Sequence, residues 1–133
     1  MAALQGTVSD LVQRKQNRDL VCVGLEDSLG KAIDIMQQNH FSQVPVTNHG
    51  KLLGMLREKE ILKEMLSGRD IKKTTVKSAM NKNVPAVKLE TKISSLQDLL
   101  LNSGSAVVIN DDSKPVHIVT KIDLVEWLSS KAP

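Results

Sequence analysis

The chain has 133 residues, of which 18 are basic and 15 acidic, giving a formal net charge of +3. This length suits one domain or two small halves and excludes a large multidomain enzyme. Apolar residues make up 41% and charged residues 25%, which excludes a disordered chain. Aromatic residues make up only 2%. This excludes the stacking platforms on which single-stranded nucleic acids bind, so no nucleic-acid partner is predicted.

The composition also predicts where the protein works. Cys22 is the single cysteine and cannot form an internal disulfide, which fits a reducing, intracellular compartment. No stretch approaches the roughly 18 to 20 apolar residues of a membrane span, and the N-terminus lacks the pattern of a secretion signal. We therefore expect a cytoplasmic protein with no membrane partner.

The first half of the chain predicts a short string of elements. Ser28 or Asp27 can cap a helix whose apolar residues recur at the spacing of one helical face. Pro45 is predicted at a sheet edge, because it cannot donate to a ladder. Gly68 marks the end of the last helix. In chain order the elements are a helical turn at 7–14, a strand at 20–23, a helix from Leu29, a hairpin of strands at 43–46 and 51–56, and a helix at 58–66.

The second half repeats this order at an offset near 63 residues. Val44–Val46 align with Val107–Ile109, and 53–62 align with 116–125 without a gap. The repeated elements are a helical turn at 75–80, a strand at 84–87, a helix at 92–102, a hairpin of strands at 105–109 and 115–119, and a helix at 121–129.

The repeat predicts the domain organisation and the fold class. The first β-α-β-β-α repeat is expected at 7–68, a connector at 69–74, the second repeat at 75–129 and a tail at 130–133. A repeat of about 60 residues buries its sheet poorly alone. We expect an α/β (α+β) protein with two three-stranded sheets, helices on one face of each, packed as a pseudo-twofold pair. The polar segment Arg69–Lys77 is predicted as a solvated loop, the alternative being a patch that binds polyanions.

The strings Phe41–Val46, Gly50–Leu56, Ser105–Ile109 and Ile118–Leu124 resemble a tandem pair of CBS domains, also called a Bateman module. The resemblance covers about Thr7 to Leu128. More narrowly, Ser105–Leu128 is similar to the C-terminal regulatory region of eukaryotic cystathionine β-synthases. The resemblance to CBS domain pairs implies a regulatory module that binds S-adenosylmethionine, AMP or ATP in clefts between the halves. Such a module controls an attached or partner enzyme, which the narrower similarity implies to be cystathionine β-synthase.

The resemblance also implies the residues of a main cleft. It assigns Thr120 and Asp123 to the ligand ribose, since a carboxylate accepts charge-assisted hydrogen bonds from vicinal hydroxyls. In the structural alternative, Thr120 caps the helix and Asp123 favours its first turn. Phe41 has an alternative as a core aromatic residue and Gln43 as an exposed strand residue. The remaining lining residues implied for this cleft are Leu20, Val21, Ser42, Val44, Ile118 and Ile122.

A second cleft departs from the family pattern. Arg57 stands where the family has Thr or Ser, and Glu60 stands where it has Asp. Arg57 can fill the cleft or pair with Glu60, so we expect a weak or empty site; alternatively, Arg57 holds a phosphate. The other residues implied for this cleft are Asn102, Ser103, Ser105 and Ala106.

No catalytic residues, cofactor or metal site are predicted. The sequence lacks the nucleophile-elbow, P-loop, zincin and paired-cysteine motifs, and His40, His49 and His117 show no metal-ligand spacing. We expect a regulatory region or stand-alone module without the catalytic, pyridoxal-phosphate domain of the cystathionine β-synthases. Apolar helix residues predict a homodimer. These residues are Ile61, Leu62, Met65, Leu66, Leu124, Val125 and Leu128. The alternative function is a dimerisation or autoinhibitory module with no ligand response.

Overall fold

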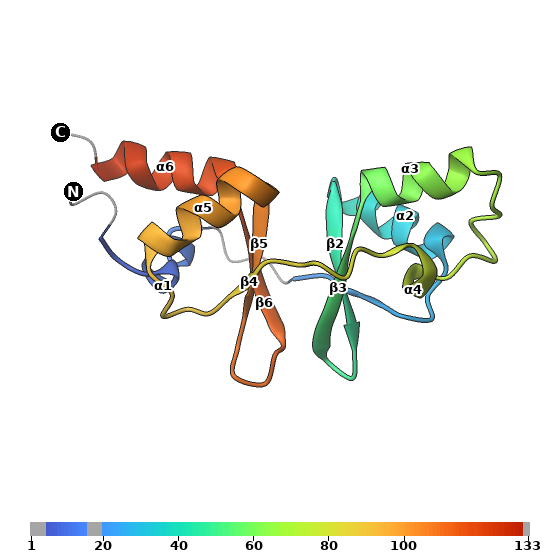
Figure 1. Cartoon of the computed structure of the whole chain (residues 1–133), viewed down its shortest axis with the longest axis horizontal. Helices are drawn as coiled ribbons and strands as arrows, with labels where there is room; N and C mark the ends of the chain where they lie inside the picture. The colour runs from blue at the N-terminus through green and yellow to red at the C-terminus, as the bar shows by residue number, and fades with distance from the viewer. Residues whose placement is uncertain (1–4, 16–19, 132–133) are drawn as a thin grey trace. The chain divides into compact units, whose positions relative to one another are not determined.

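The computed structural model describes residues 5–15 and 20–131, which form two compact units. The continuous unit lies within residues 21–84, and the split unit combines parts of residues 1–20 and 85–133. Each unit holds one three-stranded sheet with its helices on one face of that sheet (Figure 1). The predicted α+β class, with two small sheets, is therefore confirmed.

The continuous unit has the sheet order β1-β2-β3, with β1 parallel to β2 and β2 antiparallel to β3. Its elements are β1 (Val23–Gly24), α2 (Leu29–Asn39), β2 (Gln43–Asn48), β3 (Lys51–Arg57), α3 (Glu58–Leu66) and α4 (Val76–Ala79). Apolar residues of α2, β2 and β3 fill its core, including Leu29, Val44 and Leu56, which are fully buried.

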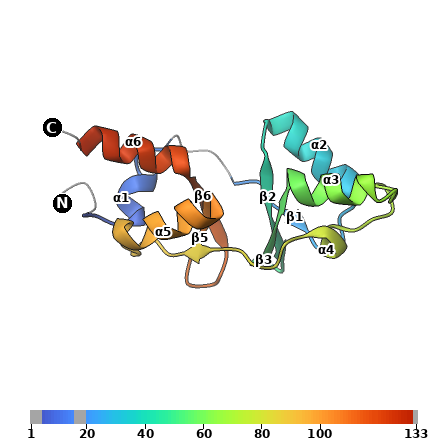
Figure 2. The same cartoon turned by 45° about the horizontal axis from the view of Figure 1, so that its top comes forward.

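The split unit repeats this arrangement with the sheet order β4-β5-β6 (Figure 2). Its core includes Leu96, Val108 and Trp127. Its elements are α1 (Val8–Val12), β4 (Ala86–Val87), α5 (Ile93–Ser103), β5 (Ser105–Ile109), β6 (Pro115–Thr120) and α6 (Lys121–Lys131). Ser130 and Lys131 thus belong to α6 and not to a tail; Ala132 and Pro133 lie outside the described residues.

The start of α2 confirms Ser28 as the capping residue. Its hydroxyl accepts a hydrogen bond from the Lys31 backbone N–H at 3.1 Å. Asp27 instead accepts the Gly24 N–H at 2.8 Å and pairs with the Lys31 ammonium at 3.1 Å. The Gly24 hydrogen bond, followed by Lys31, holds the pKa of Asp27 below its ordinary value.

The short helices α1 and α4 each pack on the unit of the other sequence repeat. The Val8 N–H donates to the Thr91 carbonyl at 2.8 Å, which ties α1 to the start of α5. The matching bond runs from the Val76 N–H to the Asp27 carbonyl, also at 2.8 Å, and ties α4 to the start of α2. The compact units therefore cut across the sequence repeats at these two helices.

The segment between α3 and α4 is attached to the continuous unit rather than being a purely solvated loop. The Leu29 N–H donates to the Thr74 carbonyl and the Gly30 N–H to the Ile71 carbonyl, at 2.9 and 3.0 Å. Ile71 also packs against the core of this unit. The segment thereby satisfies N–H groups at the start of α2 that have no partner within the helix.

The strand register corrects the predicted repeat alignment by one residue. Val46 faces Gly54 across β2–β3, and Val108 faces His117 across β5–β6, so Val46 corresponds to Val108 rather than to Ile109. The predicted edge position of Pro45 is also wrong, because β2 is the central strand. At the corresponding position, Val107 donates its N–H to Pro85, just before β4. Pro45 loses only that bond, which lies outside the two-residue ladder with β1.

Candidate functional site

The β6–α6 junction holds Thr120 and Asp123 close together. Asp123 Oδ2 accepts the Thr120 backbone N–H at 2.8 Å and its hydroxyl at 3.2 Å. This is one half of a capping box, in which an acidic residue of the first turn binds back to the residue before the helix. Asp123 thus has the first-turn role of the structural alternative, whereas none of the described hydrogen bonds runs from a helix N–H to the Thr120 hydroxyl. The contacts fix the carboxylate at the end of the sheet, with 11% of its side chain exposed.

A third group on this carboxylate is Lys15, which the sequence reasoning missed. Its Nζ lies 2.9 Å from Asp123 Oδ2 and 2.5 Å from the Ile118 carbonyl oxygen. Lys15 follows α1, and α1 packs on the split unit, so the lysine reaches a partner 108 positions away. No local pattern in the sequence indicates a contact at that separation.

A small pocket of about 120 Å³ adjoins this junction inside the split unit. Lys15 and Asp123 form part of its wall, together with Arg14, which donates to the Ser130 hydroxyl. The Arg14 guanidinium lies 5.8 Å from the centre of the Trp127 ring, and the Lys131 ammonium lies 4.7 Å from it. The residues lining the pocket are Leu11, Arg14, Lys15, Asp123, Glu126 and Trp127.

His117 on β6 adds a titratable group near Lys15. Partial burial, followed by the charge of Lys15, lowers the pKa of His117 below its ordinary value of 6.5. Both effects disfavour the imidazolium. Among the described residues, no three His, Cys, Asp or Glu side chains gather where one metal ion would fit.

The β3–α3 junction of the continuous unit has the corresponding geometry with different side chains. Arg57 is the last residue of β3, and its Nε donates to Glu60 Oε1 at 3.0 Å, so of the alternatives predicted for Arg57 the structure contains the pairing with Glu60. Glu60 Oε2 is buried and has no hydrogen-bond partner within the described ranges, 5–15 and 20–131. A buried acceptor in this state calls for a donor.

The other predicted site residues lie at several places within the two units. Ser105 pairs with Thr120 across β5–β6, and Gln43 pairs with Arg57 across β2–β3. Val44 and Ala106 have their side chains in the cores of their own units, so only their backbones are available to a ligand. Phe41 packs, partly buried, against the core, as in its structural alternative.

The remaining predicted lining residues are more accessible. Ile122 is exposed on the first turn of α6, and Ile118 is half-buried on β6. Leu20 and Val21 precede β1 instead of lying in it, and the neighbouring Cys22 is half-buried. Ser42, Asn102 and Ser103 are exposed. The grouping of all these residues into two clefts stays a prediction.

Comparison with known proteins identifies the repeat. The family model described as CBS domain matches residues 8–67 and again residues 76–130. A cystathionine beta-synthase of Saccharomyces cerevisiae is 33% identical over 118 residues, which cover 73% of this chain and 23% of that protein. The cystathionine beta-synthase of Dictyostelium discoideum is 28% identical over 128 residues, covering 92% of this chain and 25% of that protein. The chain thus spans about a quarter of these relatives.

Solved structures share the fold. The CBS domain protein NE2398 is 25% identical with a TM-score of 0.81, covering 96% of this chain and 99% of that one. The CBS domain pair of protein MJ0100, crystallised with 5-methylthioadenosine and S-adenosyl-L-methionine, is 20% identical with a TM-score of 0.76 and covers 96% and 99%. None of the described helices is both long enough and apolar enough to cross a membrane.

Proposed function

The chain belongs to the CBS domain family, and on that premise we propose that it is a regulatory module that binds an adenosyl compound and controls an attached or partner enzyme. The observation that carries this proposal is the β6–α6 junction. There Thr120 and Asp123 hold a hydroxyl and a carboxylate together at the end of a strand.

The chemistry of this junction suits a ribose. Asp123 Oδ2 accepts three hydrogen bonds, and none of the described hydrogen bonds ends on Oδ1. An ionised carboxylate can accept from two vicinal hydroxyls at once, and such charge-assisted bonds are stronger than neutral ones. The Thr120 hydroxyl can both donate and accept. S-adenosylmethionine, AMP and ATP all carry the vicinal ribose hydroxyls that such a site recognises.

Regulation requires that the ligand bind one conformation of the module more tightly than another. The ligand then shifts the population toward that conformation, and the enzyme responds to the shift. We propose cystathionine β-synthase as that enzyme, because two curated relatives bear this name. The chain itself matches the CBS domain over both repeats, which is a regulatory and not a catalytic module. A cytoplasmic location and the absence of a resident cofactor belong to this proposal.

Titration calorimetry and thermal unfolding with S-adenosylmethionine, AMP and ATP test the proposal. A ligand at 100 times its dissociation constant stabilises the folded state by about 2.7 kcal/mol. We expect heat and a raised unfolding temperature with at least one compound. No heat and no stabilisation with any of the three would reject ligand sensing.

The alternative function is a dimerisation or autoinhibitory module whose sites are filled by its own side chains. The Arg57–Glu60 and Lys15–Asp123 pairs favour it, because each occupies a carboxylate that a ligand would need. The unpartnered Glu60 Oε2 argues the other way, since it offers an acceptor in the site expected to be weak or empty. Light scattering with and without AMP separates the two functions: a dimer that AMP neither binds nor alters supports the alternative.

A further inference from the structure

Lys15 places a positive charge on the carboxylate proposed to receive the ribose. We propose that Lys15 sets the charge selectivity of this site, so that the module favours adenosine phosphates over S-adenosylmethionine, which carries a sulfonium cation. This inference rests on the proposed function and names the ligand class of the same site.

The contacts of Lys15 keep its ammonium at the site when the carboxylate turns to a ligand. An ammonium has three N–H donors. One contact goes to Asp123 Oδ2 at 2.9 Å and one to the Ile118 carbonyl oxygen at 2.5 Å. The Ile118 carbonyl belongs to β6 and does not compete for the ribose. A hydroxyl that displaces Lys15 from Asp123 therefore leaves the ammonium anchored on the strand, with donors available for an anionic group.

Electrostatics then gives the sign of the selectivity. Asp123 alone would attract a sulfonium and repel a phosphate. Lys15 neutralises that charge at contact distance, with 29% of its side chain exposed. The 5′ substituent of a nucleoside is a few bonds from its 3′-hydroxyl. When Asp123 binds the ribose, the charge on that substituent therefore lies no farther from Lys15 than about the Debye length of 8 Å, and salt does not screen the two charges fully from each other.

The other charges on the pocket wall are Arg14 and Glu126. Both are exposed, so solvent screens them more than it screens Lys15, and their signs oppose each other. The N-terminus of α6, an 11-residue helix, adds partial positive charge at the same junction. Once Lys15 has neutralised Asp123, this partial charge leaves the site favourable to an anion.

The experiment measures dissociation constants of AMP, ATP, adenosine and S-adenosylmethionine by calorimetry at about 0.15 M salt, close to physiological ionic strength. We expect the unmodified protein to bind AMP more tightly than S-adenosylmethionine. Lys15→Met should shift the ratio of these two constants toward S-adenosylmethionine by about 10-fold to 100-fold, because it removes a charge-assisted contact. Adenosine, which lacks a charged group, should change least.

Two further variants make the result specific. Lys114→Met removes the same charge from the exposed turn between β5 and β6 of the same unit, and it should leave the ratio unchanged. Lys15→Gln keeps a polar side chain and should show the same shift as Lys15→Met, with thermal unfolding confirming that each variant is folded.

The outcomes separate this inference from the proposed function. The charge selectivity would be overturned if the unmodified protein bound S-adenosylmethionine as tightly as AMP. It would also be overturned if neither Lys15 substitution changed the ratio of the two dissociation constants. Both results would leave ligand binding itself intact. If none of the four compounds bound the unmodified protein, the proposed function would be wrong and the selectivity would fall with it.

Discussion

At the scale of single residues, the two strand–helix junctions reach the same electrostatic result with different side chains. In the split unit Lys15, which is distant in sequence, neutralises Asp123. In the continuous unit Arg57, three residues before Glu60, neutralises that carboxylate. Neutralisation by a cation therefore does not distinguish the two sites. They differ in the residue that ends the strand: the Thr120 hydroxyl donates and accepts, whereas the Arg57 guanidinium only donates.

This difference predicts unequal effects of removing the two carboxylates. Asp123→Ala should weaken binding of the preferred adenosyl compound about 10-fold to 150-fold, the loss of hydrogen bonds to a charged acceptor. Glu60→Ala should weaken it much less, because the residue beside that carboxylate is Arg57, whose guanidinium only donates and offers no hydroxyl that could accept from the ribose. Calorimetry on both variants checks this. An equal or larger loss in Glu60→Ala would show that the buried Glu60 Oε2 is the working acceptor.

The lowered pKa of His117 predicts a pH dependence of stability. The unfolded state binds a proton near the ordinary pKa of 6.5, whereas the folded state resists protonation until a lower pH. The contribution of neutral His117 to the free energy of unfolding is therefore complete above pH 6.5. It declines as the pH falls from there toward the pKa of His117 in the folded state.

Urea unfolding of the unmodified protein and His117→Gln, from about pH 8 to about pH 5, measures this contribution. The stability advantage of the unmodified protein should shrink as the pH falls. Lys15→Met should reduce the effect, since Lys15 is one of its two causes. A pH-independent difference between the unmodified protein and His117→Gln would contradict the predicted burial and charge effects on the imidazole.

The candidate site was predictable only as far as its contacts are local. Arg57 and Glu60 are three residues apart at a helix start, and their pairing was one of the alternatives predicted for Arg57. Thr120 and Asp123 have the same spacing, and the structural alternative named the helix-start role of Asp123. Lys15 was missed because its contact depends on which unit receives α1. The buried state of Glu60 Oε2 was equally beyond the sequence, because it depends on tertiary packing.

At the scale of elements, strong hydrophobic periodicity predicted the long helices and the hairpins. Helix α3 and strand β5 begin and end where expected. The short strands β1 and β4 begin two or three residues later than predicted, since two-residue strands have no periodicity of their own and are defined by their pairing partners. The one-residue slip in the repeat alignment has the same origin, because consecutive apolar residues fit either register.

The packing of the chain after α4 against β3 predicts that replacing Gly54 of β3 by alanine destabilises the protein. A Cβ at Gly54 would lie 2.7 Å from Met80 Sδ and 2.9 Å from the Asn81 carbonyl oxygen. Asn81 is fixed by two backbone hydrogen bonds to Met55, so it cannot move aside easily. Gly54→Ala should therefore destabilise the protein by about 1 to 3 kcal/mol.

Gly30→Ala provides the matched control in helix α2. The nearest atoms to its Cβ would be 3.7 Å away, an ordinary contact distance. This variant should stabilise the protein by about 0.4 to 1 kcal/mol, because alanine restricts the unfolded chain. Denaturant unfolding of both variants gives the two signs, and a tolerated Gly54→Ala would mean that the segment at Asn81 is not held against β3.

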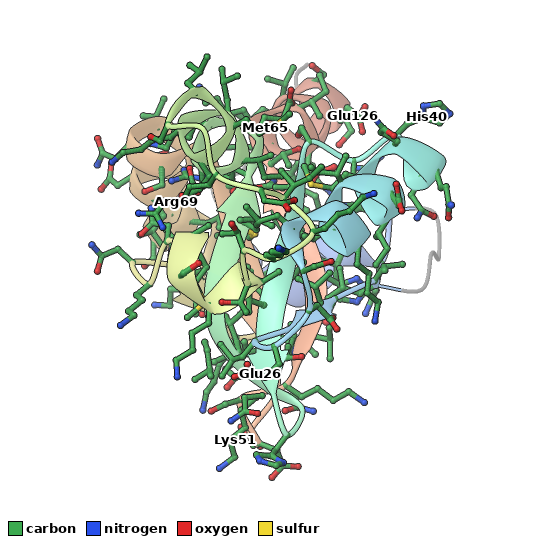
Figure 3. All side chains as sticks on the ribbon, turned by 90° about the vertical axis from the view of Figure 1, so that its right-hand side faces the viewer. Glu26, His40, Lys51, Met65, Arg69 and Glu126 are labelled. Carbon is green, nitrogen blue, oxygen red and sulfur yellow. The ribbon has the colours of Figure 1, made fainter. Side chains whose placement is uncertain are left out.

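At the scale of the whole molecule, the structure shows which of the apolar helix residues predicted to form a homodimer interface are exposed. Ile61 is buried, and Leu124 and Leu128 pack against the core of the split unit, so these three are not free to form an interface. Met65 projects from α3 in Figure 3 and is exposed, as are Leu62 and Leu66 on the same helix. We propose α3 as the principal self-association face, with Ile122 and Val125 of α6 also exposed.

This face predicts the effect of one charged substitution. Leu66 is 79% exposed on α3, and Leu66→Glu should shift the protein toward the monomer in sedimentation at tens of micromolar. Leu101→Glu makes the same change at a residue that is 72% exposed on α5 and should leave the oligomeric state unchanged. A monomeric unmodified protein, or dissociation by Leu101→Glu alone, would exclude the α3 interface.

In the sequence, the two parts of the split unit stand before and after the continuous unit. The two units are therefore completed at different times during synthesis on the ribosome. Once residue 84 has emerged, the continuous unit has all of its chain, whereas α1, made earlier, must wait for α5 and α6. A nascent chain stalled after the continuous unit should therefore protect residues 21–84 from protease while α1 remains cleavable. Helix α1 is synthesised before the continuous unit but packs only after it, so Val8, Leu11 and Val12 stay exposed to chaperones until α5 and α6 have been made.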